Sequence, residues 1–206
     1  MQMLIRFMGA TILLAGASQA HPQTVPSVTG IVQQYLQTPH GEVNGVLLSD
    51  GTVVRFPPHL GIAVASTVKS GDPVNVVGFP GPRTPHGRSI KALTMTNTAT
   101  GRTVVDQPPT SKPLPPAQGG FSRKTMTISG TIRHILVNSH GDPDGAILSG
   151  GEQIAFKPHQ RARVLKKLQR VGKAVTVTGP GTTTPFGTVI ELESLTIDGE
   201  TVHLKN

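Results

Sequence analysis

The chain has 206 residues, no cysteine and a formal net charge of +8, with 19 Lys and Arg against 11 Asp and Glu. The lack of cysteine excludes disulfides, catalytic thiols, cysteine-based metal sites and lipidation at a cysteine. The basic balance favours an anionic partner, because clustered positive charge raises the local concentration of anions.

The first 20 residues are typical of a secretory signal peptide. Arg6 gives the positive start, residues 7–17 form an apolar run, and Ser18 and Ala20 are the small residues that a cleavage site needs. The apolar run is shorter than the roughly 20 residues of a membrane-spanning helix. We therefore expect a cleaved, periplasmic or secreted protein without a membrane span; an uncleaved N-terminal anchor is the alternative.

The rest of the sequence contains one stretch twice, and matching landmarks lie 100 residues apart. Residues 44–51 (Asn-Gly-Val-Leu-Leu-Ser-Asp-Gly) return as 144–151 (Asp-Gly-Ala-Ile-Leu-Ser-Gly-Gly). This period is too long for a solenoid, whose repeats are roughly 20–50 residues. We predict two small domains, over residues 27–105 and 125–206. The Pro/Gly-rich linker between them, 106–124, is expected to be extended.

Both copies predict the same elements in chain order: two strands, a tight turn, a third strand ended by proline, a short helix and two more strands. We expect strands at 28–36, 45–49, 52–56, 74–77 and 90–96, and at 127–137, 145–149, 152–156, 174–178 and 189–197. Helices are expected at 60–68 and 160–171, and short terminal strands lie within 99–105 and 198–204. A glycine in each first strand, Gly30 or Gly130, suggests a bulge or a bend.

Three strands, a helix and two strands in roughly 80 residues is the pattern of the OB fold. We predict an all-β protein of two tandem, small, OB-like five-stranded Greek-key barrels. Each barrel has one short helix between strands three and four. An SH3-like barrel is the alternative.

The repeated pattern Gly-x-Val, Asn-Gly-Val-Leu-Leu-x-Asp-Gly-Thr and Phe-Pro-Pro-His resembles exported bacterial OB-fold proteins of largely unknown function, loosely described as nucleic-acid-binding-like. The resemblance covers both copies and implies a fold, but it carries no catalytic motif. In the second copy the turn is Gly150-Gly151 and the strand end is Phe156-Lys157-Pro158-His159. These departures imply that a shared ligand contact there has diverged.

The sequence contains none of the usual enzyme motifs. A nucleophile elbow, a P-loop, a His-Glu-x-x-His motif and an EF-hand loop are all missing. The first copy has three carboxylates, Glu42, Asp50 and Asp72, and the two aspartates lie in turn signals. We therefore expect a non-enzymatic binding or interaction module.

A basic helix in the second copy is the main candidate site for an anionic envelope ligand or protein partner. Its apolar positions Val164, Leu165, Leu168 and Val171 share one face, so the cations surround the rest. The candidate residues are Arg83 and Arg88 in a first-copy loop and Arg161, Arg163, Lys166, Lys167 and Arg170 in the helix. The structural alternative is a solvated helix face.

Repeated histidines define a second hypothesis, a periplasmic metal-binding protein. His40, His59, His140 and His159 occupy equivalent positions in the two copies. Imidazole binds copper, zinc and nickel. Turn and helix-end roles explain these histidines more directly and are the favoured interpretation. No other cofactor is expected.

Single-stranded nucleic acid is a third hypothesis, because OB barrels stack bases on aromatic side chains. The chain has no Trp, one Tyr and six Phe. Phe56 and Phe156 are expected in the core, which leaves Tyr35, Phe79 and Phe186 as exposed candidates. Nucleic acid is therefore a possible but less favoured partner.

Overall fold

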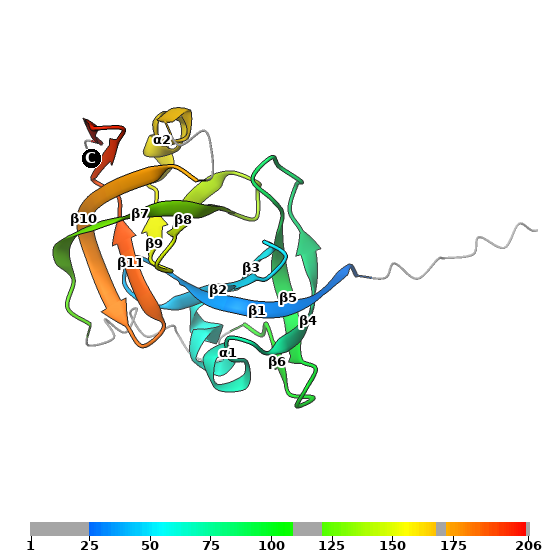
Figure 1. The fold of residues 1–206 in the computed structure, drawn as a ribbon. Helices are drawn as coiled ribbons and strands as arrows, with labels where there is room; N and C mark the ends of the chain where they lie inside the picture. The colour runs from blue at the N-terminus through cyan, green and yellow to red at the C-terminus, as the bar shows by residue number, and fades with distance from the viewer. Residues whose placement is uncertain (1–24, 109–120, 168–171, 205–206) are drawn as a thin grey trace, which may run out of the picture.

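The computed structural model describes residues 25–108, 121–167 and 172–204 (Figure 1). The predicted signal peptide, most of the linker and Arg170 lie outside these ranges. No helix among the described residues is long and apolar enough to cross a membrane.

The first copy is a closed barrel of five strands, as predicted. Its strands are β1 (Ser27–Gln37), β2 (Val43–Leu48), β3 (Val53–Arg55), β4 (Pro73–Pro80) and β5 (Ser89–Asn97). A short sixth strand, β6 (Thr103–Val105), pairs with β5 outside the closed barrel. The sheet order is β3-β2-β1-β4-β5-β6, and a parallel pairing of β3 with β5 closes the barrel. A 3-10 turn (Pro58–Leu60) and helix α1 (Gly61–Thr67) lie between β3 and β4. This is the OB topology.

The second copy repeats this topology. Its strands are β7 (Lys124–Val137), β8 (Pro143–Leu148), β9 (Gln153–Ala155), β10 (Ala174–Thr184), β11 (Gly187–Glu191), β12 (Ser194–Ile197) and β13 (Glu200–His203). Parallel pairing of β9 with β11 closes this barrel. Helix α2 (Arg161–Lys167) follows a 3-10 turn (Pro158–Gln160). The described part of α2 buries Val164, as its predicted apolar face requires.

Two local predictions were wrong. The strand expected at 174–178 continues to Thr184 as β10, because the β-branched residues 182–184 pair with β11. The strand expected at 189–197 is divided into β11 and β12.

The first-strand glycines do not mark the bulges. The register shifts lie later, between Val32 and Gln34 and between Ile132 and His134. Gly30 instead permits close packing, since a Cβ there would lie 2.9 Å from the Leu48 side chain.

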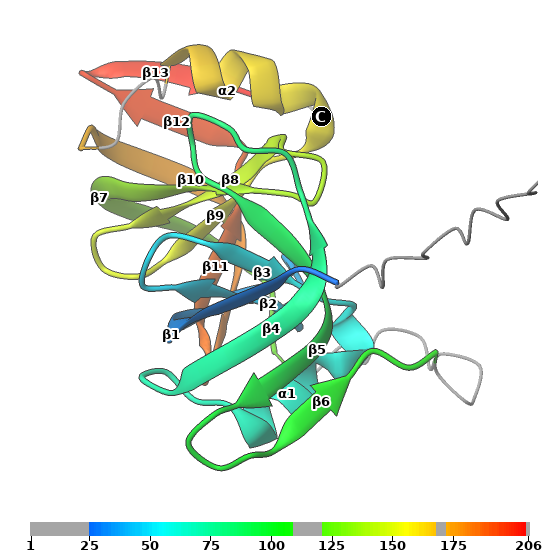
Figure 2. The ribbon, with the colours of Figure 1, turned by 90° about the vertical axis from the view of Figure 1, so that its right-hand side faces the viewer.

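Each barrel has its own apolar core, and a third apolar cluster joins the two barrels. Phe56 and Phe156 are buried in their respective barrels, as predicted. The joining cluster contains Leu36, Leu47 and Val53 from the first barrel and Leu136, Val137 and Ile147 from the second. Leu36 and Leu136 are repeat equivalents, so the barrels meet in a nearly twofold-symmetric way. Figure 2 shows the barrels stacked, with β2 and β3 next to β9 and β11. We call this contact the seam.

Candidate functional site at the seam between the barrels

The seam covers the surface with which OB barrels usually bind ligands. That surface is the face of strands two and three, together with the loops that join strands one to two and four to five. Thr182 Oγ1 donates a hydrogen bond to the carbonyl of Pro39 at 3.1 Å. On the other side, Ser89 Oγ donates to the carbonyl of Asn138 at 2.7 Å. Each copy's first loop therefore contacts the other copy's β4–β5 or β10–β11 region.

Buried glutamines form one half of the seam. The backbone N–H of Gln37 donates to Gln153 Oε1 at 2.9 Å, and Gln153 Nε2 donates to the carbonyl of Gln37 at 2.8 Å. Thr184 Oγ1 adds a hydrogen bond to Gln37 Oε1 at 2.6 Å. The repeat equivalents of the two glutamines are Val137 and Val53, which belong to the apolar cluster. The seam thus has a polar half and an apolar half.

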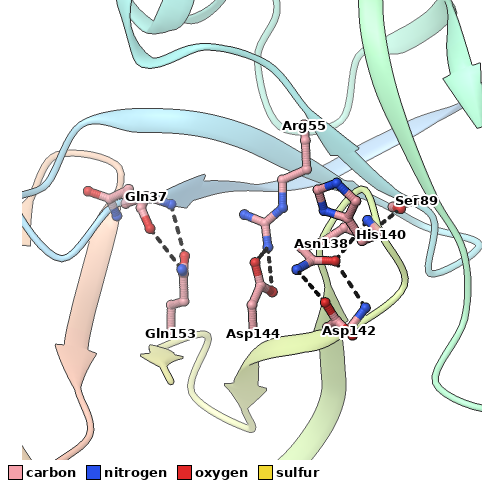
Figure 3. A network of polar contacts seen from close by, with 8 residues as sticks. All are labelled: Gln37, Arg55, Ser89, Asn138, His140, Asp142, Asp144 and Gln153. Atoms are coloured by element: carbon pink, nitrogen blue, oxygen red, sulfur yellow. Dashed lines mark hydrogen bonds and ion pairs between the residues drawn. The ribbon is translucent and has the colours of Figure 1, made fainter. Parts of the chain in front are cut away.

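An ion pair crosses the seam beside these glutamines. The Arg55 NH2 group donates to both carboxylate oxygens of Asp144, at 2.8 and 2.9 Å. Figure 3 shows Arg55 and Asp144 between the Gln37–Gln153 pair and the Asn138 loop. The Arg55 side chain is 14% exposed, so this pair is well shielded from water.

A cleft of about 330 Å³ opens next to this ion pair. We call it the seam cleft. Its lining residues are Asn44, Arg55, Phe56, Pro57, Pro58 and Lys91 from the first barrel and Asn138, Ser139 and Asp144 from the second. Its volume lies at the lower end of the range for small-molecule sites, roughly 300–1,000 Å³.

Two residues that line the seam cleft each have a fully buried polar atom without a hydrogen-bond partner among the described residues. These atoms are Arg55 Nε, a donor, and Asn44 Oδ1, an acceptor. Such groups are rare, since roughly 90% or more of buried polar groups are paired. Each costs about 1–3 kcal/mol when left unpaired. Lys91, on β5, is exposed, and none of the described carboxylates forms an ion pair with it.

At the equivalent position of the second copy, the cationic side chains are paired with a carboxylate of the same barrel. Glu191, the counterpart of Lys91, accepts from Arg123 at 2.8 Å and lies 3.0 Å from the Lys157 ammonium. Burial raises the pKa of the Glu191 carboxyl, but the hydrogen bonds and charges of Lys157 and Arg123 outweigh it, and the pKa falls below its ordinary value. The second copy therefore supplies its own carboxylate where the first copy has Lys91.

The cations predicted from the sequence are distributed differently. The Arg88 guanidinium donates to Asp50 and to the Thr52 hydroxyl, each at 2.8 Å. Burial raises the pKa of Asp50, but hydrogen bonds from Thr52 and Arg88 bring it below its ordinary value. Arg83 is exposed on the same loop.

On α2, Lys167 pairs with Glu200 at 2.6 Å, and Lys166 is exposed. Arg161 and Arg163 begin α2, but their side chains lie outside the described part of the structure, as does Arg170. The described ion pairs thus leave Arg83 and Lys166 as the predicted cations that face solvent without a partner among the described residues.

The predicted histidines lie at exposed loop and turn positions. His40, His59, His140 and His159 are all exposed. His59 Nε2 lies 3.2 Å from the carbonyl of Gln107 and 3.9 Å from Asp106. Within the described ranges, no group of three or more His, Asp or Glu residues has the arrangement of a metal site.

The site residues predicted from the sequence do not include Asn44, Arg55 or Lys91. A signal for them was present, because their repeat counterparts are Asp144, Ala155 and Glu191, so charge changes at all three positions. These residues lie in strands that both copies share, so a difference in backbone structure does not explain the change of residue.

The comparisons with known proteins do not identify a family for this chain. No family model and no curated protein matches the chain. The wild-type single-stranded DNA binding protein from Thermus aquaticus aligns with 11% identity and a TM-score of 0.27, over 87% of this chain and 95% of that chain. A deletion mutant of that protein aligns with 11% identity and a TM-score of 0.26, over 87% and 96%. The topology and the seam define a tandem OB-fold protein with two barrels packed face to face.

Proposed function

We propose that this protein is a non-enzymatic binding module that holds an anionic group in the seam cleft. The observation that carries the proposal is the exposed Lys91 side chain, which lines the seam cleft beside Arg55 and forms no ion pair with a described carboxylate. Hydrogen bonds between charged groups are roughly twice as strong as neutral ones. An anionic ligand would do for Lys91 what Glu191 does for Lys157 and Arg123.

The predicted export of the chain supports an envelope component as the source of this anion. Without Arg6 of the predicted signal peptide, 18 Lys and Arg stand against 11 Asp and Glu, and this net charge of +7 adds a long-range attraction for such a polymer. Helix α2 and Arg83 then serve as secondary contacts, while the seam cleft provides the specific site.

A heparin-derived oligosaccharide is a suitable polyanionic probe. We expect Lys91→Gln to weaken its binding by about tenfold, which corresponds to about 1.4 kcal/mol, as measured by calorimetry at fixed salt. Lys69→Gln removes the same charge from an exposed site outside the cleft lining and is the matched control. Equal binding by wild type and Lys91→Gln would overturn the proposal. Loss on neutralising Lys166 and Lys167 alone would instead place the site on α2.

Single-stranded nucleic acid is a second candidate, favoured by aromatic side chains at the opposite side of the seam. Phe186 is 37% exposed, and its ring packs edge-to-face on Tyr35 with 5.0 Å between centroids. Phe121, 44% exposed, lies close to Gly41 in the adjoining loop. Bases stack on such rings with about 1–3 kcal/mol each.

Fluorescence anisotropy with labelled oligo-dT tests this candidate. We expect Phe186→Ala to weaken a genuine complex by about fivefold or more, in line with the loss of one stacked base. Phe79→Ala, which removes an exposed ring from β4, is the control. Unchanged affinity in the Phe186 variant would exclude nucleic-acid binding through this aromatic group.

A further inference from the structure

We infer that the outer surface of the first barrel's sheet is a contact surface for a second copy of this chain, and that the contact forms a twofold-symmetric dimer. The inference goes beyond the proposed function, because it concerns the outside of the sheet and requires no anion. It is carried by a cluster of exposed apolar side chains that the second barrel lacks.

The cluster lies on β1, β4, β5 and β6, which are side by side in the first barrel (Figure 2). Seven large apolar side chains are exposed among the described residues. Four of them lie on or beside these strands and are between 44% and 57% exposed, namely Val25, Ile31, Phe79 and Val105. A cluster of exposed apolar side chains is typical of an interaction site, whereas single ones are not.

The strand register places these side chains on one surface, because residues directly opposite each other on paired strands point to the same side. The rows across the strands are Phe79 with Lys91; Ser27 with Val77, Thr94 and Val105; Thr29 with Asn75, Thr96 and Thr103; and Ile31 with Pro73. Val25, two residues before Ser27, continues the alternation of β1. We call the surface formed by these rows the outer face.

The second barrel has a polar surface at the equivalent position. The residues equivalent to Val25, Ile31, Phe79 and Val105 are Thr125, Thr131, Pro180 and His203. Hydroxyl groups on this surface pair across the strands, Thr127 with Thr178 at 2.8 Å and Ser129 with Thr176 at 2.7 Å. Both barrels have the same topology, so the barrel itself does not require the exposed apolar residues of the outer face.

The chemistry of the outer face favours a second copy as its partner. Its rows contain one charged side chain, Lys91, although the chain as a whole is strongly basic. Two copies therefore repel each other less through this face than through the rest of their surfaces. Its Ser, Thr and Asn side chains both donate and accept hydrogen bonds, so they match the same groups on a second copy, whereas a bilayer core offers them no partner.

The outer face occurs once in each chain, so its contact with itself is isologous and closes at two copies. Four strands about 4.8 Å apart, with roughly seven residues along each at about 3.3 Å per residue, span roughly 20 Å in both directions. That flat area of roughly 400 Å² is less than the roughly 800 Å² that each partner buries in a standard interface. We therefore expect a weak dimer, with a dissociation constant on the order of 10–100 μM.

Sedimentation equilibrium of the chain without its predicted signal peptide tests the inference, over concentrations from about 5 to about 500 μM. We expect a monomer–dimer equilibrium that added salt strengthens, because salt screens the repulsion between two chains of net charge +7 and leaves the apolar contact in place. An association that salt weakens would be driven by charge and would contradict an apolar contact.

Matched variants locate the contact. Ile31→Thr installs the residue of the second copy and should raise the dissociation constant by about tenfold, because the dimer loses the apolar group twice. Ile62→Thr makes the same change at an 86% exposed position on α1 and should have no effect.

A second pair of variants tests the same face by adding charge. Thr29→Lys should reduce the dimer below detection, because it places an unpaired charge in the contact from each side. Ser129→Lys, at the equivalent position of the second barrel, should leave the dimer intact. Thermal unfolding checks that each variant is folded.

Two results would overturn the inference. One is a wild type that stays monomeric over the whole concentration range. The other is a dimer that Ile31→Thr and Thr29→Lys leave unchanged, since such a dimer forms through another surface. Lys91→Gln, which tests the anion site, should not weaken the dimer, so failure of this inference and failure of the proposed function are distinguishable.

Discussion

Gln153 makes one half of the seam polar, whereas the equivalent half is apolar. Its side-chain amide bonds both backbone groups of Gln37, and both residues are buried. At the repeat-equivalent place Val53 and Val137 pack without a side-chain hydrogen bond. Loss of the Gln153 side chain therefore leaves the N–H and the carbonyl of Gln37 without their partner inside the seam. Loss of the Val53 side chain, at the equivalent position, removes no hydrogen bond of this kind.

We expect Gln153→Leu to lower the free energy of unfolding by about 1–3 kcal/mol, because the N–H and carbonyl of Gln37 lose their partner inside the protein. Urea denaturation measures the change. Gln33→Leu, on the exposed side of β1, is the control and should alter stability by less than about 0.5 kcal/mol. Equal effects from the two substitutions would show that the buried hydrogen bonds do not stabilise the seam.

His134 occupies the seam position that Gln34 occupies in the first copy. Gln34 Nε2 donates to the carbonyl of Gly151 at 3.2 Å, and His134 makes the equivalent hydrogen bond to the backbone of Gly51. Its Nε2 is buried without a partner among the described residues. Burial lowers the pKa of the His134 imidazole below its ordinary value, although the Gly51 bond and the Asp50 charge act in the opposite direction.

This pKa shift predicts a loss of stability on mild acidification. The unfolded chain takes up the proton near pH 6.5, whereas the folded chain resists it to lower pH, so the free energy of unfolding falls as the pH drops from about 7 to 5. Asp50 and Glu191, whose pKa values are lowered, lose their contribution only below about pH 4.5.

Urea titrations at several pH values measure this slope. His134→Gln, which installs the residue of the first copy, should flatten it, while His140→Gln at an exposed loop position should not. An unchanged slope in His134→Gln would assign the acid sensitivity to another group.

At the scale of elements, glycines set how closely neighbouring strands approach. A Cβ on Gly78 of β4 would lie 2.1 Å from the carbonyl oxygen of Lys91 on β5. Gly179 of β10 has the same relation to the carbonyl of Glu191, at 2.0 Å. These contacts involve backbone atoms, which cannot rotate away as a side chain can.

Gly78→Ala should therefore separate β4 from β5 and destabilise the protein by about 1–3 kcal/mol, measured by thermal or urea unfolding. It should also weaken anion binding, since β5 carries Lys91. Gly101→Asn is a suitable control, because Gly101 has open space around it and a positive φ that asparagine tolerates. A loss in Gly78→Ala no larger than in the control would contradict this account of the strand contact.

The elements of each barrel could be predicted because local signals and tertiary packing agree. The Asp50-Gly51 turn and the proline after Phe56 mark the two ends of the third strand in the sequence. The long β10 was underestimated, because a Gly/Pro/Thr segment has weak local preference and is fixed by its pairing with β11. Sheet pairing of this kind is a tertiary effect.

The seam cleft could not be predicted from one copy alone. Its residues come from both barrels, and the apolar residues Leu36 and Leu47, which hold the barrels together, look like ordinary core positions in a strand pattern. A residue-by-residue comparison of the copies would have found Arg55 and Lys91, but not the ion pair from Arg55 to Asp144, which depends on the arrangement of the barrels.

At the scale of the molecule, the two barrels form one packed body. Each barrel contributes three residues to the joining cluster, and none of these residues is more than 3% exposed. Because each barrel would expose these apolar side chains on its own, we expect the barrels to unfold together.

Leu136→Ala tests this coupling. Removal of a buried leucine side chain should cost about 2–5 kcal/mol and lower the stability of the first barrel together with the second. Calorimetry should show one transition in the wild type, shifted as a whole in the variant. A variant with two resolved transitions, the first barrel unshifted, would show that the barrels unfold independently. Val28→Ala, at a partly buried position in the first barrel's core, provides a comparison outside the seam.

Because the two barrels belong to one chain, their face-to-face contact does not depend on the protein concentration. Two separate barrels that met through this seam would be a dimer, and its population would fall as the protein became scarce. Here residues 106–124 keep the partners on one polypeptide, so their association is intramolecular, with an effective concentration on the order of millimolar for a short linker. At low total protein concentration the chain therefore keeps its seam, and with it a cleft built from both barrels.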